Sequence, residues 1–95
     1  MDEVMLFDHD DLYVSATLAD DGDLRISGQD LRHGEYEYFL TVRAADIPTV
    51  VAALGGHDPA DLLALLGARG EDIVHRGEKS WLNSLGIKPT FFSPS

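Results

Sequence analysis

The spacing of hydrophobic residues divides the chain into two unlike halves. Before residue 46, apolar side chains recur at every second position, the period of a strand with one face on a core and the other in water. After residue 46 they recur at every third or fourth position, as in amphipathic helices. The change of period falls within residues 35–56, so we expect strands before this stretch and mostly helices after it.

Three strands are expected before residue 30. A short apolar run at residues 4–7 is followed by clean alternation at residues 12–18 and again at residues 24–28. The aspartate-rich turn between the last two contains Gly22, which can take the positive φ that a tight turn requires. Residues 12–28 therefore form a hairpin.

A fourth strand, at residues 35–43, has two different faces. Phe39 lies on the face that is otherwise polar, so we expect this face not to be uniformly wet. The opposite face is apolar and aromatic, and its members are Tyr36, Tyr38, Leu40 and Val42.

Two helices follow, each with recognisable ends. Asp46 and Pro48 mark the start of the first, because a carboxylate suits the free N–H groups there and proline is tolerated in the first turn. Gly55 marks its end. Asp58 caps the second helix, which we expect to end near Gly70.

The last quarter of the chain is less regular. Residues 71–77 allow three interpretations, namely a short turn, an exposed strand or a loop. Residues 78–85 form a third helix, and Pro89 prevents its continuation. Residues 90–92 form a final short strand or a packed tail, and we expect the two adjacent phenylalanines there to leave the solvent.

These elements predict one domain of the α+β class over residues 1–95. Its antiparallel sheet has about four strands, with a short C-terminal fifth strand as an option. Two or three helices pack on one face of the sheet.

The net charge of −10 is concentrated in the strand half. Twelve acidic and three basic residues precede Ile47, whereas five acidic and four basic residues lie from Ile47 onward. Such a field disfavours nucleic acid and anionic membranes as partners and favours a basic protein. No segment approaches the ~20 apolar residues that span a bilayer, and none resembles a signal peptide, so we expect a cytoplasmic protein.

No catalytic or cofactor motif is present in the sequence. The absence of cysteine excludes disulfides, thiolate metal sites and a cysteine nucleophile. The four histidines fall in or beside expected connections, with no spacing that suits a metal, and pairs such as Ser80 with His75 or Ser15 with His9 lack an orienting acid. We therefore expect a protein that is not an enzyme and needs no cofactor.

The aspartates of the first two turns allow one alternative, a calcium-dependent module. Asp8, Asp10 and Asp11 could gather oxygen ligands with the aspartates of the second turn if both turns lay at one end of the sheet. The EF-hand order of acids is absent, because Ala19 and Thr17 occupy positions that require acids.

Four segments carry a resemblance to known proteins: EYEYFLTV, IPTVVAALGG, DLLALL and WLNSLGI with the aromatic tail. This pattern resembles a group of small acidic bacterial proteins with no assigned enzymatic activity. In size, charge and class the chain is also similar to immunity proteins that neutralise bacterial toxins. The resemblance implies a fold and a class of function, and it transfers no binding residue.

Our leading hypothesis is a non-enzymatic binding module, an immunity or antitoxin-like inhibitor that masks the basic surface of a toxin-like partner. Carboxylates would pair with basic groups and tyrosines would anchor the contact. The expected partner-binding residues are Asp20, Asp21, Asp23, Glu35, Glu37, Tyr13, Tyr36 and Tyr38. The alternative is a structural protein that forms a homodimer through an exposed strand edge or through Phe91 and Phe92.

Overall fold

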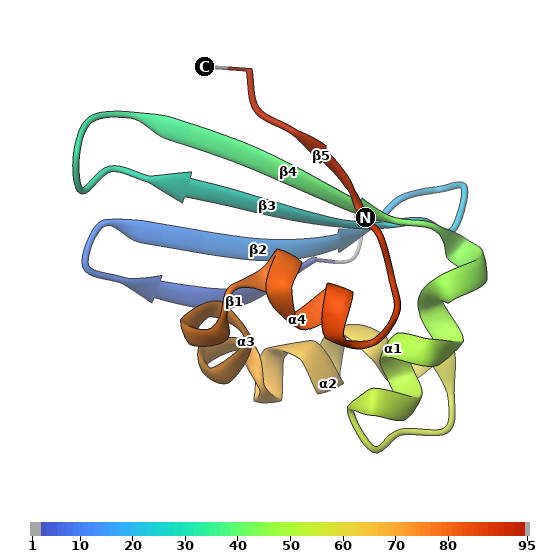
Figure 1. The fold of residues 1–95 in the computed structure, drawn as a ribbon. Helices are drawn as coiled ribbons and strands as arrows, with labels where there is room; N and C mark the ends of the chain where they lie inside the picture. The colour runs from blue at the N-terminus through green and yellow to red at the C-terminus, as the bar shows by residue number, and fades with distance from the viewer. Residues whose placement is uncertain (1–2, 95) are drawn as a thin grey trace.

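The computed structural model describes residues 3–94, which form one antiparallel sheet with helices on one of its faces (Figure 1). The five strands lie side by side in the order in which they occur along the chain, as a meander. Consecutive hairpin turns therefore fall at opposite ends of the sheet. The strands are β1 (Glu3–His9), β2 (Leu12–Leu18), β3 (Leu24–Asp30), β4 (Tyr36–Val42) and β5 (Thr90–Phe92).

Four α-helices and two short 3-10 turns form the second layer, below the sheet in Figure 1. Proline stands in the first turn of both α1 and η2, where its missing N–H costs no hydrogen bond. In chain order the layer comprises η1 (Ala44–Asp46), α1 (Ile47–Ala53), η2 (Pro59–Asp61), α2 (Leu62–Ala68), α3 (Gly70–Arg76) and α4 (Glu78–Ser84).

The hydrophobic core lies between the two layers. Alternate residues of β2, β3 and β4 point into it, as the period of two predicts. The helices contribute apolar residues spaced by three or four, such as Val50, Val51 and Leu54. The largest side chains that are fully buried are Leu24, Ile26, Leu40, Leu62, Leu66 and Leu82.

The structure confirms the expected class, the antiparallel sheet and the placement of helices on one face. The optional fifth strand is present and pairs with β4. With it, the sheet of residues 3–94 has the four expected strands and the optional fifth, and the same residues form four helices, one more than the two or three expected. The additional helix is α3, which occupies most of the segment that had three interpretations.

Three local expectations had different outcomes. Asp58 is the N-cap of η2, the 3-10 turn that leads into α2, and its carboxylate accepts a hydrogen bond of 2.9 Å from the N–H of Ala60. Asp46 stands at the N-cap of α1, but its side chain makes no capping hydrogen bond. The expectation that Phe91 and Phe92 leave the solvent was wrong, because they remain 46% and 57% exposed.

No helix within residues 3–94 is long and apolar enough to cross a membrane.

Candidate functional site

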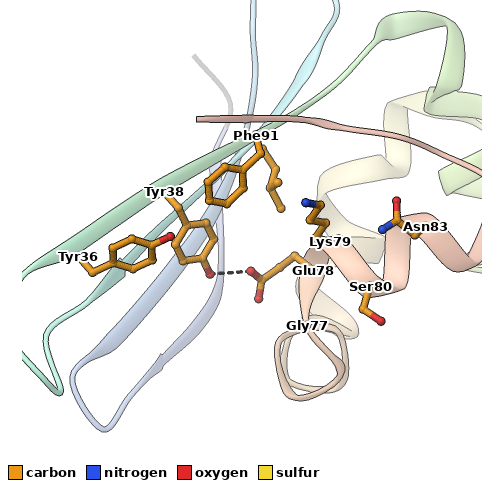
Figure 2. A pocket seen from close by; sticks show the side chains of 9 residues that line it. Tyr36, Tyr38, Gly77, Glu78, Lys79, Ser80, Asn83 and Phe91 are labelled. Atoms are coloured by element: carbon orange, nitrogen blue, oxygen red, sulfur yellow. Dashed lines mark hydrogen bonds between the residues drawn. The ribbon is translucent and has the colours of Figure 1, made fainter. Parts of the chain in front are cut away.

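An open groove of about 540 Å³ lies between β4, β5 and α4 (Figure 2). Tyr36, Tyr38 and Phe91 line it from the sheet, on the face that carries the helices. Glu78, Lys79, Ser80 and Asn83 line it from α4. The groove therefore has an aromatic wall that faces a polar wall.

Glu78 is the most unusual residue of the groove. It is only 7% exposed, and within residues 3–94 it is the only charged residue that is buried. Its carboxylate accepts a hydrogen bond of 2.6 Å from the Tyr38 hydroxyl, the contact drawn in Figure 2. Burial raises the pKa of Glu78 above its ordinary value, because the charged form loses solvation, while the bond from Tyr38 opposes this shift.

The position of Tyr38 depends on a glycine in the neighbouring strand. Gly28 of β3 pairs with Tyr38 of β4, and a Cβ atom built on Gly28 would overlap the Tyr38 ring. The ring thus lies across the bare backbone of β3, with its hydroxyl directed at α4. Burial is the main reason that the pKa of Tyr38 is raised, and the contact with Glu78 adds to it.

The aromatic wall is continuous. The ring centroids of Tyr36 and Tyr38 are 5.9 Å apart, and those of Tyr38 and Phe91 are 6.4 Å apart with nearly parallel planes. Lys79 reaches over this wall, with its Nζ atom 5.5 Å from the centroid of Phe91. One cation of the chain itself therefore already rests on a ring of the groove.

The face of the sheet opposite the helices, which we call the bare face, is a second candidate surface. Figure 1 shows that none of the helices in the described part of the chain covers it. A shallow depression of about 250 Å³ lies there, lined by Met5, Tyr13, Phe39 and Glu37 among other residues. Met5 is 51% exposed and Tyr13 is 37% exposed.

Phe39 is the centre of an aromatic cluster on this bare face. Its ring stacks with that of Phe92 at a centroid distance of 6.3 Å. The guanidinium of Arg25 lies 4.3 Å from the Phe39 centroid. The prediction that this face is not uniformly wet is confirmed, since Phe39 is only partly exposed.

The expected partner-binding residues do not form one site. Asp20, Asp21 and Asp23 lie in the turn between β2 and β3, at one end of the sheet. Asp23 is engaged within the fold, because its carboxylate accepts a hydrogen bond of 2.8 Å from the N–H of Ala44. Glu35 lies at the opposite end, between β3 and β4.

The remaining members divide between the two faces. Tyr13 and Glu37 lie on the bare face, where both line the depression. Tyr36 and Tyr38 lie on the helix side, where both line the groove. These four residues thus divide between two surfaces, one on each face of the sheet, and the alternation along β4 predicts this division for Tyr36, Glu37 and Tyr38.

The idea that the aspartates of the first two turns gather at one end of the sheet was wrong. The turn that holds Asp10 and Asp11 joins β1 to β2, and the next turn, with Asp20 and Asp21, lies at the other end of the meander. Among the residues that the structure describes, no three histidine or acidic side chains are placed to hold a metal ion.

The histidines differ from expectation in one place. His75 lies inside α3 rather than in or beside a connection, and its ring meets that of Phe7 edge-on at 5.7 Å. Within residues 3–94, neither Ser80 nor Ser15 makes a side-chain hydrogen bond to a histidine.

Glu78 and Lys79 were not predicted as parts of a site, and Phe91 was considered only as a contact of a homodimer. One signal was available, because Glu78 is four residues before Leu82 and seven before Leu85. That spacing places an acidic residue on the inward stripe of the third expected helix. A carboxylate at an inward position is unusual and marks a candidate for a special role.

No protein-family model, curated protein or solved structure matches the chain. The sequence and geometry of the chain alone therefore carry the functional argument.

Proposed function

We propose that the chain is a non-enzymatic protein-binding module for a partner with a basic surface. The form that we favour is an immunity or antitoxin-like inhibitor, which masks a basic cleft of a toxin-like protein. The bare face of the sheet carries this proposal, because it combines exposed apolar and aromatic side chains with acidic groups at its ends.

The composition of the bare face suits a protein interface. Interfaces that bind specifically have an apolar, aromatic centre and a polar rim. Met5, Tyr13 and Phe92 supply exposed apolar area on this face, and serine, threonine and glutamine side chains surround them. Tyr13 is the best anchor, since a tyrosine loses little rotamer freedom and offers a hydroxyl for hydrogen bonding.

Acidic groups surround the bare face and would attract a basic partner to it. Asp20 and Asp21 lie at one end of the sheet, Asp11 and Glu35 lie at the other, and Glu37 lies on the bare face itself. With a net charge of −10, the field attracts a basic protein from a distance and speeds the encounter.

Charge reversal near the bare face tests this proposal. The partner is captured from the native cell on the wild-type protein, and its association rate is then measured with the double variant Glu35→Lys and Glu37→Lys across salt concentrations. We expect association at low salt to slow by roughly tenfold, with little effect at high salt because ions screen the charges.

A matched variant separates local charge from net charge. Glu71 and Asp72 are exposed on α3 in the helix layer, so changing both to lysine alters the net charge equally without touching the bare face. This control should slow association much less. Equal slowing in both double variants, or no slowing in either, contradicts the proposal.

A homodimer is the second candidate. β5 is a short edge strand, and Phe92 at that edge is 57% exposed on the bare face. Two copies could join through this edge without a foreign partner. Sedimentation across dilution and salt distinguishes the candidates, since an apolar dimer persists at high salt and a binding module sediments as a monomer.

A further inference from the structure

We propose that the groove between β4, β5 and α4 is a binding site for one guanidinium group, an arginine side chain of a partner protein. Glu78 would pair with the guanidinium, and the rings of Tyr36, Tyr38 and Phe91 would contact its faces. This inference is independent of the proposed function, because the groove lies on the helix side of β4 and the bare face lies on the other.

The first argument is the state of Glu78. Its carboxylate is buried and receives a hydrogen bond from the neutral hydroxyl of Tyr38. Within the described residues, the only ion pair joins Arg32 to Asp30, so no basic side chain of this region pairs with Glu78. A buried carboxylate without a cation is costly, and a bound cation would offset that cost.

The second argument is the position of the carboxylate in a groove that is open to solvent. Glu78 lines the groove together with the three rings, so a ligand that enters can reach both (Figure 2). Tyr36 and Phe91 are 43% and 46% exposed, which leaves ring area available for contact. An acidic group beside exposed aromatic faces is the combination that binds organic cations.

The position of the Lys79 ammonium also supports the proposal. Its ammonium lies over the Phe91 ring rather than beside the Glu78 carboxylate, although the two residues are adjacent in α4. Neighbouring residues of a helix point in different directions. Lys79 therefore contacts the Phe91 ring and forms no ion pair with Glu78. The wall thus accepts a cation, and the carboxylate still lacks one.

Arginine fits this arrangement better than lysine. A guanidinium is planar, so it can lie against aromatic rings while its N–H groups form a fork toward a carboxylate. It is also less strongly hydrated than an ammonium and enters a partly buried groove at lower cost. The overall negative charge of the chain favours the approach of either cation.

The test is a titration of the whole 95-residue chain with arginine blocked as N-acetyl-arginine amide, followed by amide chemical shifts. We expect saturable shifts confined to β4, β5 and the first turns of α4. Glu78→Gln should weaken binding by roughly tenfold, because a charge-assisted pair is lost. Glu71→Gln, which changes the net charge equally on an exposed part of α3, should leave binding unchanged.

A second variant, Lys79→Gln, still tests the proposal if Glu78→Gln disturbs the fold. Lys79 is exposed, so Lys79→Gln should fold normally and should strengthen binding severalfold, because the competing cation leaves the Phe91 ring. Lys88→Gln is the matched control and should have little effect, since Lys88 lies outside the groove.

Two further ligands identify the chemistry. The neutral isostere N-acetyl-citrulline amide should not bind, and tetramethylammonium should bind more weakly because it cannot donate hydrogen bonds to Glu78. Equal binding of the citrulline compound would overturn the proposal. So would shifts that do not saturate, a Lys79→Gln variant that binds more weakly, or tighter binding of tetramethylammonium than of the arginine compound.

Discussion

The hydroxyl of Tyr38 and the carboxylate of Glu78 meet at 2.6 Å, across 40 residues of sequence and between the two layers of the fold. Tyr38 belongs to the sheet and Glu78 begins α4, so this hydrogen bond fixes the helix against the strand at the groove. The short distance is typical of a hydroxyl that donates to an ionised acceptor. A buried carboxyl group and a partly buried phenol are thus held together.

Removing the hydroxyl should destabilise the protein at neutral pH. In Tyr38→Phe the Glu78 carboxylate loses its donor while it stays buried, which costs about 1–3 kcal/mol of unfolding free energy. Urea unfolding measures this loss. Tyr36→Phe is the control, because the Tyr36 hydroxyl makes no hydrogen bond in the described part of the chain and its removal should cost far less. Equal losses in both variants would show that the bond is unimportant.

Glu78 should also make stability depend on pH. Because burial raises its pKa in the folded state, the folded protein holds a proton at a pH where the unfolded chain has released it. The contribution of Glu78 is therefore fully present below the ordinary carboxyl pKa and is lost as the pH rises through the raised pKa. The difference in unfolding free energy between wild type and Glu78→Gln should fall with pH in that window, by at most about 1.4 kcal/mol per pH unit. If the difference in unfolding free energy between wild type and Glu78→Gln rose with pH, the pKa of Glu78 could not be raised in the folded state.

A methyl group on Gly28 should disturb both the sheet and the groove. In Gly28→Ala the new Cβ meets the Tyr38 ring, so the ring must move and its bond to Glu78 must weaken. We expect a loss of about 1–3 kcal/mol, as for other overpacked sites. Ser27→Ala, at the next position but on the bare face, is the control and should cost less. Urea unfolding gives both values, and near-ultraviolet circular dichroism reports the displacement of Tyr38.

The Asp30 carboxylate provides a test that involves neither surface. Both of its oxygens accept hydrogen bonds from the Arg32 side chain, at 2.9 and 2.7 Å. These bonds, together with a bond of 3.0 Å from the backbone N–H of Arg32, lower the pKa of Asp30 to about 2. Because this pKa is depressed, the contribution of the pair to stability is present above the ordinary carboxyl pKa and is lost as the pH falls toward 2. Carboxyl chemical shifts should show the low pKa in the wild type and a higher pKa in Arg32→Gln, still below 3.8 because the backbone N–H of residue 32 continues to donate to Asp30. An unchanged pKa would show that the pair does not persist in solution.

Much of the fold could be predicted because its signals are local. Alternation at residues 12–18 and 36–42 fixes which face is buried, and Asp58 and Pro59 mark the start of a helix by their own chemistry. The helix α3 was not predicted, because Gly70 is a poor helix former and was expected to end α2. Gly70 lies instead at a close approach, where a Cβ would overlap the backbone of Leu6.

The candidate site could be predicted only in part, because it depends on contacts between distant segments. The pattern of residues 35–43 placed Tyr36 and Tyr38 on one face, but nothing local places Phe91 beside them or Glu78 opposite. The division of the acidic residues between two ends of the sheet follows from strand order, which the sequence analysis did not determine. The location of each residue on its own element was predictable, and the assembly of the surfaces was not.

Site-specific cross-linking tests most directly whether a basic partner binds the bare face of the sheet. A photo-reactive phenylalanine analogue is placed at Tyr13, which is exposed on the bare face, or at Ala64, which is exposed on α2 in the helix layer. After irradiation in the native cell, we expect one basic protein to be attached through position 13 and not through position 64. Attachment only to a second copy of the chain, or equal attachment through both positions, would contradict the binding of a basic partner at the bare face.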